Sequence, residues 1–108
     1  MIAVIFEVIP SLEGKAEYLD LAADLKPVLE DIDGFISVER FQSLTDPDKI
    51  LSLSFWRDED AVKQWRELEQ HRMAQQQGRF RLFTDYRLRV AEVQRDYGKQ
   101  QREQAPAN

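Results

Sequence analysis

The stretch LSLSFWRDED, residues 51–60, decides the fold. Its first half alternates strictly, so that Leu51, Leu53 and Phe55 share one face while the serines between them share the other. This period-two pattern is typical of a β-strand. Asp58 is a good helix N-cap, and the acidic residues after it complement the positive end of a helix dipole. The stretch therefore predicts a strand that passes directly into a helix.

Four further elements are predicted on either side of this stretch. Pro10 ends an apolar run because proline cannot donate to a strand ladder. Gly34 suits the left-handed position that ends a helix. The predicted strands cover residues 2–9, 35–43, 50–56 and 84–95, and the predicted helices cover residues 14–32 and 58–78. The order βαββαβ indicates an α+β, ferredoxin-like fold, in which two helices lie on one face of a four-stranded antiparallel sheet.

The first helix is expected to bury one apolar stripe. Ser11 is the expected N-cap, and Pro27 is expected to kink the helix near residues 23–26. The stripe that helical spacing predicts contains the following residues: Leu12, Ala16, Leu19, Ala22 or Ala23, Leu25, Val28, Leu29 and Ile32.

The second face of the predicted sheet indicates a homodimer. Two helices cover one face only, yet the first strand has Ile or Val on both faces and the third strand has large apolar residues on both. Soluble monomers rarely leave such a patch in water. A second copy packed sheet to sheet, as an isologous dimer, would cover it.

Composition excludes several classes of function. The chain of 108 residues lacks cysteine, which rules out disulfides, thiolate catalysis and cysteine-based metal sites. Residues 1–70 carry a net charge of −9 and residues 71–108 carry +4. The acidic total disfavours nucleic-acid binding, and no apolar run is long enough to cross a membrane. We expect a cytoplasmic protein with one domain, residues 1–97, and a polar, mobile tail, residues 98–108.

Five features together resemble a known family. Gly34-Phe35 opens the second strand, Phe55-Trp56 closes the third, and an acidic helix start precedes Trp65 and then a histidine. In this order the chain resembles the antibiotic biosynthesis monooxygenase domain, of the dimeric α+β barrel type, over residues 1–97. The resemblance implies a pocket between the sheet and the helices of each subunit, closed partly by the dimer.

The resemblance also implies a reaction. The family includes oxygenases that need no cofactor and convert polyphenols to quinones, so the implied substrate is a small aromatic or enolic compound, with no metal or cofactor. Such a site needs a base, an oxyanion holder and dry apolar walls. His71 is the candidate base and Arg79, Arg81 or Arg87 the candidate anion holder. The candidate walls and hydrogen-bonding groups are Trp65, Phe83, Tyr86, Phe6, Phe35, Phe41 and Phe55.

Two departures from the family pattern keep alternatives open. Ala61 stands where the oxygenase branch often has an asparagine, and Gln75 stands where the haem-degrading branch has its histidine ligand. The alternatives are a dimeric ligand-binding or stress-related module without catalysis, a haem-degrading oxygenase, and an isomerase of a small molecule. Each candidate residue also has a structural alternative: His71 at a helix surface, Trp65 in the core, and the arginines on a solvated or dimer-facing strand.

Overall fold

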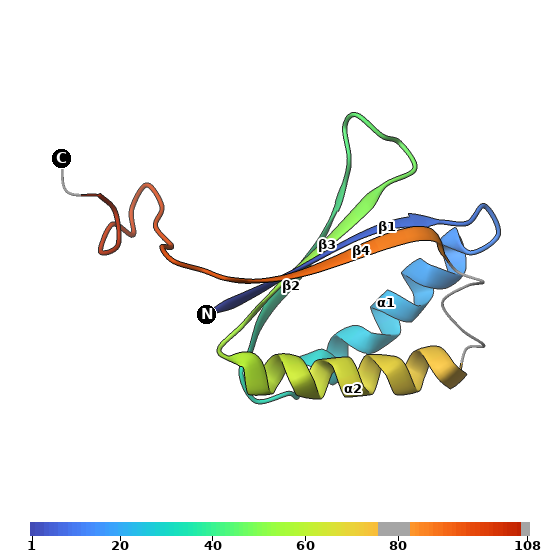
Figure 1. Ribbon diagram of the computed structural model, residues 1–108, viewed down its shortest axis with the longest axis horizontal. Coiled ribbons are helices and arrows are strands. Elements are labelled where there is room, and N and C mark those ends of the chain that lie inside the picture. The colour runs from blue at the N-terminus through green and yellow to red at the C-terminus, as the bar shows by residue number, and fades with distance from the viewer. Residues whose placement is uncertain (76–82, 107–108) are drawn as a thin grey trace.

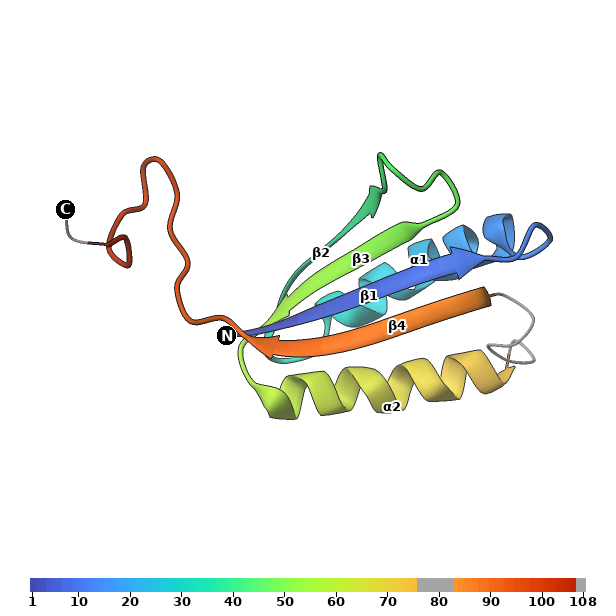
Figure 2. The same ribbon diagram turned by 45° about the horizontal axis from the view of Figure 1, so that its top comes forward.

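A computed structural model describes residues 1–75 and 83–106, and for residues 69–75 the backbone alone. The strands pair antiparallel in the order β2-β3-β1-β4, and both helices lie on one face of the sheet (Figures 1 and 2). The predicted ferredoxin-like βαββαβ fold is confirmed. The elements are β1 (Ile2–Pro10), α1 (Lys15–Glu30), β2 (Phe35–Gln42), β3 (Ile50–Trp56), α2 (Glu59–Gln75) and β4 (Phe83–Glu92).

The strand register assigns each side chain to a face of the sheet. Ser52 lies opposite Phe6 of β1 and Arg40 of β2, on the face that the helices cover. Leu53 lies opposite Ile5 of β1, on the face without helices, which we call the open face. Strand β3 therefore presents small serines to the helices and large apolar residues to the open face.

The core beneath the helices is divided into two clusters. Trp56 is fully buried at the centre of the first, where its Nε1 donates to Ser54 Oγ at 2.9 Å. Its ring centroid lies 5.2 Å from that of Phe35 and 6.0 Å from that of Trp65. The first cluster contains Ile2, Val4, Leu29, Trp56, Ala61, Val62 and Trp65, and the second contains Val8, Tyr18, Leu21, Ile50 and Phe83.

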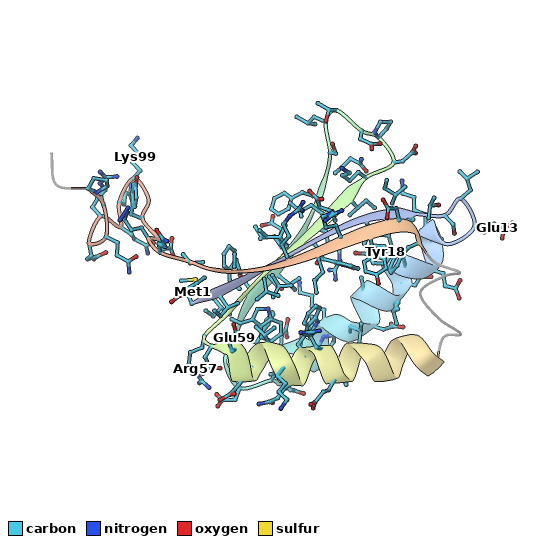
Figure 3. The ribbon with its side chains drawn as sticks, in the orientation of Figure 1. Met1, Glu13, Tyr18, Arg57, Glu59 and Lys99 are labelled. Carbon is cyan, nitrogen blue, oxygen red and sulfur yellow. The ribbon has the colours of Figure 1, made fainter. Side chains whose placement is uncertain are left out.

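The predicted stripe of α1 is wrong in its first half. Leu12 is fully exposed and Leu19 is 42% exposed, whereas Tyr18 and Leu21 are buried. The helix begins only at Lys15, so Leu12 lies in the turn before it. With Leu12 outside the helix, the buried face passes through Tyr18, which points from α1 towards the sheet (Figure 3).

The N-cap of α1 also differs from the prediction. Gly14, not Ser11, occupies the N-cap position, and no side chain caps the helix. Ser11 Oγ instead accepts a hydrogen bond from Gly14 N at 2.9 Å in the preceding turn. Helix α1 continues past Pro27 to Glu30, and the kink expected near residues 23–26 stays a prediction.

The turn into β2 packs against the start of α2. Gly34 has φ +96°, and a Cβ there would lie 2.8 Å from the Cβ of Ala61. Gly34 O also accepts a hydrogen bond from Arg57 N at 2.7 Å. The left-handed backbone and this close approach both require glycine.

Arg57 also forms ion pairs at the surface beside this contact between the turn into β2 and the start of α2. The Arg57 guanidinium donates to both carboxylate oxygens of Asp33, at 3.1 and 3.2 Å, and to Asp58 at 3.0 Å. Hydrogen bonding and charge from Arg57 lower the pKa of Asp33. The pKa of Asp58 is lowered chiefly by the backbone N–H of Ala61, which donates to its Oδ1 at 3.0 Å. This bond confirms Asp58 as the N-cap of α2.

The chain leaves the body of the protein after β4. Val93 N donates to Met1 O at 2.9 Å, and residues 94–106 then extend away from the sheet (Figures 1 and 2). Within this segment Asp96 N donates to Gln104 Oε1 at 2.7 Å, and Arg102 lies over the ring of Tyr97. We call residues 94–106 the arm; its predicted mobility stays a prediction. Among the helices of the described residues none is long and apolar enough to cross a membrane.

Replacing Gly34 with alanine is expected to destabilise the protein by about 2–4 kcal/mol, because the new Cβ forces both a left-handed alanine and a clash with Ala61. Urea unfolding followed by tryptophan fluorescence measures the change. Gly98→Ala is the matched control, since a Cβ there meets no atom within 4 Å, and it should change stability by less than about 0.5 kcal/mol. Equal effects of the two substitutions would contradict the assigned role of Gly34.

Candidate functional site

A narrow cavity lies between α1 and the sheet, with Trp65 of α2 at its side. Its volume is about 50 Å³, and the empty space between its walls, counted out to the solvent at the mouth, is about 550 Å³. A volume of about 50 Å³ holds a few waters, and only the larger volume of about 550 Å³ falls in the range of small-molecule sites. A ligand must therefore displace side chains as it enters. The apolar walls include Phe6, Leu21, Leu25, Val38, Trp65 and Phe83, and the polar lining includes Arg40, Ser52 and Ser54.

The cavity follows the boundary between the two core clusters. Leu29 and Trp65 contribute from the first cluster, and Leu21 and Phe83 contribute from the second. Between them β3 supplies only the short side chains of its serines. Large apolar residues at those positions would fill the space, so the cavity originates in the alternation of β3.

One end of the cavity has an aromatic wall. The ring of Phe83 packs edge-on against Tyr18, with centroids 5.4 Å apart, and against Phe6 at 5.8 Å. Tyr86 follows at 6.0 Å from Phe83. Edge-to-face contacts of this kind add to the stability that burial alone provides, and they fix the ring orientations. This end offers flat, rigid surfaces to a ligand.

The structure brings three of the predicted site residues, Trp65, Phe83 and Phe6, together at the cavity. Trp65 and Phe83 are each 8% exposed and both line it. Tyr86 lies on the covered face beside Phe83 but is 45% exposed and does not line the cavity. Arg87 lies opposite Glu7 on the open face, away from the cavity.

His71, Arg79 and Arg81 remain untested as site residues, and Arg81, like Arg79, lies outside the described residues. His71 belongs to α2, but its side chain lies outside the described part of the chain, and Arg79 lies outside the described residues altogether. Their roles as base and anion holder stay predictions.

Arg40 is a cavity residue that the sequence reasoning missed. Its Nε–H is shielded from solvent and has no hydrogen-bond partner among the described residues. The signal that would have found it is its position in β2: it is two residues from Val38, on the covered face, opposite a serine of β3. A charged side chain on the covered face of a sheet is unusual and indicates a specific partner.

Ala61 has a packing role that accounts for the missing asparagine. Its side chain is 1% exposed and belongs to the cluster around Trp56, where Gly34 approaches it closely. It does not line the cavity. Among the described side chains no three His, Cys, Asp or Glu residues come together in a way that could hold a metal ion.

Known proteins resemble this chain in sequence and in fold. Residues 1–77 match the family model described as antibiotic biosynthesis monooxygenase. A protein of Pyricularia oryzae named jasmonate monooxygenase ABM is 50% identical over 93 residues, which are 86% of this chain and 43% of that protein. This chain thus spans less than half the length of that relative. The Bacillus subtilis protein YqjZ, described as uncharacterised, is 33% identical over 94 residues, which are 86% of this chain and 79% of that protein. The crystal structure of Rv0793 from Mycobacterium tuberculosis superposes with a TM-score of 0.72 at 16% identity, covering 90% of this chain and 98% of that one.

Filling the cavity should block binding of an apolar probe. Ala22 is buried in the cavity wall and Ala23, the next residue of α1, is exposed. The three extra carbons of Ala22→Leu occupy the cavity, so the affinity for N-phenyl-1-naphthylamine, measured by its fluorescence, should fall at least about tenfold. Ala23→Leu makes the same change on the outer face and should leave the affinity within about twofold. If Ala22→Leu binds the dye as the wild type does, this cavity is not its binding site.

Proposed function

The chain belongs to the antibiotic biosynthesis monooxygenase family, and from that premise we propose that it oxygenates a small aromatic or enolic compound without a cofactor. The observation that carries the proposal is an apolar cavity whose described lining contains one charged side chain, Arg40, on the sheet side, with Trp65 also in its wall. Such a pocket can exclude water from a flat substrate and still stabilise a negative charge within it.

The chemistry requires a substrate that donates electrons. Dioxygen reacts slowly with closed-shell molecules, but a phenolate or enolate can transfer an electron to it. In the balanced reaction a phenol and one O₂ give a quinone and one water: one oxygen atom forms the new carbonyl and the other leaves as water. All four electrons that reduce O₂ come from the substrate, whose O–H hydrogen and one ring C–H hydrogen end up in the water. The protein has to remove the first proton and hold the resulting anion.

Residues of this chain fit parts of that task. The apolar walls exclude water, which strengthens every electrostatic interaction inside the cavity. Arg40 supplies a fixed cation for a negative charge on the substrate. His71 remains the predicted base, because imidazole exchanges protons near neutral pH.

The name of the Pyricularia relative adds a second candidate substrate. That protein is named as a jasmonate monooxygenase and shares half of its aligned residues with this chain. Jasmonate has a ketone that can form an enolate, which agrees with an enolic substrate. Because this chain spans 43% of that relative, its activity here is part of the proposal.

We also propose that the protein is a homodimer joined through the open faces of two sheets. Leu51, Leu53 and Phe55 are only half-buried there, and Phe41 is 42% exposed. A groove lined by Ile36, Phe55 and Val93, among others, runs from the open face to the base of the arm. An isologous partner would cover this surface and receive the arm, which extends away from the sheet of its own subunit (Figure 1). The cytoplasmic location expected from the sequence stays a prediction.

Oxygen uptake tests the reaction. The wild-type protein, mixed in air with a panel of phenols, hydroquinones and jasmonate, should consume one O₂ per product formed. His71→Ala should lower the rate about 10²-fold or more, the usual contribution of a general base. Arg66→Ala, a change on the exposed face of α2, should leave it unchanged. If the wild type consumes no more oxygen than His71→Ala on any substrate, the oxygenase proposal fails and a ligand-binding module remains. A Soret shift on haem titration would favour the haem-degrading alternative.

Light scattering tests the dimer. The wild type should have about twice the mass of the 12.7 kDa chain. Leu53→Lys places a charge in the centre of the proposed interface, where it cannot be solvated, and should give a monomer. Leu44→Lys makes the same change at a fully exposed position in the β2–β3 turn and should leave the dimer intact. A wild-type monomer at micromolar concentration would overturn the proposed interface.

A further inference from the structure

Arg40 is a half-buried arginine whose side chain lines the cavity. It belongs to β2 and lies opposite Ser52, with its side chain in the lining of the cavity. The neighbouring lining is apolar, with Val38 on the same strand and Leu29 of α1 and Trp65 of α2 across from the sheet. The residue as a whole is half-buried, but its Nε–H is shielded from solvent, and a shielded donor needs an acceptor.

No described residue provides that pairing. The ion pairs among the described residues join Arg57 to Asp33 and Asp58, and Arg89 to Glu7, and none of them includes Arg40. The Nε–H of Arg40 is shielded from solvent and lacks an acceptor among the described residues. Buried polar groups of native proteins are nearly always hydrogen-bonded, so an orphaned donor in a cavity indicates an acceptor that arrives from outside.

The chemistry of arginine narrows the class of acceptor. Its planar guanidinium presents parallel N–H groups that fit the two oxygens of a carboxylate, and such charge-assisted pairs are stronger than neutral hydrogen bonds. Ser52, directly across the strand pair, adds a hydroxyl to the same patch of the lining. A single phenolate oxygen would use only part of this donor set.

We propose that Arg40 is the anion-binding residue of the cavity and that the natural ligand is a small carboxylic acid with an apolar body. The carboxylate binds the guanidinium at the sheet, and the body lies against the apolar residues of α1 and the aromatic wall around Phe83. In this way Arg40 fixes which end of the ligand faces the sheet. The proposal rests on the proposed function for the identity of the ligand as substrate, but the binding site itself does not depend on catalysis.

A pair of matched probes tests the assignment. 1-Naphthylacetate is ionised at neutral pH, and 1-naphthylacetamide has nearly the same shape without the charge. Calorimetric titration of the wild type should show at least a tenfold preference for the acetate. Arg40→Met should abolish the preference by weakening acetate binding at least tenfold while amide binding stays within about twofold. Arg66→Met removes the same charge from the exposed face of α2 and should keep the wild-type preference.

The remaining outcomes each count for or against the proposal. Arg40→Lys, which keeps the charge and loses the parallel donors, should retain an intermediate preference, and it carries the test if Arg40→Met does not fold. A wild type with no preference, a wild type that binds neither probe, or an Arg40→Met protein that prefers the acetate as before would each overturn the proposal. Oxygen uptake is measured separately, so an Arg40-dependent preference without uptake refutes the oxygenase function and leaves the site standing.

Discussion

The alternation of β3 is the constraint on which the other features depend. A strand of a sheet covered on one face normally points its large apolar residues at the helices and its polar residues at solvent. Strand β3 does the reverse over its central residues, with serines beneath the helices and Leu51, Leu53 and Phe55 on the open face. A one-residue shift of register would exchange these faces, so the pairing with β1 fixes both at once. The cavity and the exposed apolar face are thus two consequences of one pattern.

The two ends of β3 compensate for the space left by its serines. Ile50 and Trp56 are the large buried residues of the strand, and each anchors one of the two core clusters. Trp56 satisfies its indole N–H through Ser54, so the serine has a structural role as well as a place in the cavity wall. Close packing of Gly34 on Ala61 and the ion pairs of Arg57 then hold the start of α2 over the Trp56 end. The helices are fixed at the clusters, and the space between the clusters stays unfilled.

The sequence predicted the order of elements because strand alternation, capping residues and turn glycines are local signals. The pocket and the place of Trp65 in it were implied by the resemblance to the family, and Phe83 was a candidate aromatic wall from the loop before the last strand; both residues line the cavity. Which face of α1 is buried could not be predicted, because Leu12 fits the helical spacing. Only the turn at Gly14 excludes Leu12 from the helix. Arg40 was missed because a lone charged residue in a strand looks like a solvent-facing one until the register assigns its face.

Among the described side chains, the one shielded nitrogen or oxygen atom without a hydrogen-bond partner is Arg40 Nε, and it belongs to the lining of the cavity. An unfilled space between the clusters and the shielded Nε–H of Arg40 without an acceptor both cost stability, and filling the space with one leucine would remove part of that cost. Departures of this kind are expected at functional sites, because a binding site must keep free the space and the hydrogen-bond donors that its ligand will use. Entry of a ligand would separate side chains along the cavity without breaking either core cluster. Trp56 belongs to one cluster and Phe83 to the other, and the cavity lies between the two. The narrow volume seen without a ligand is therefore compatible with a binding site, because the boundary between two independently packed clusters is where a core can widen at the lowest free-energy cost.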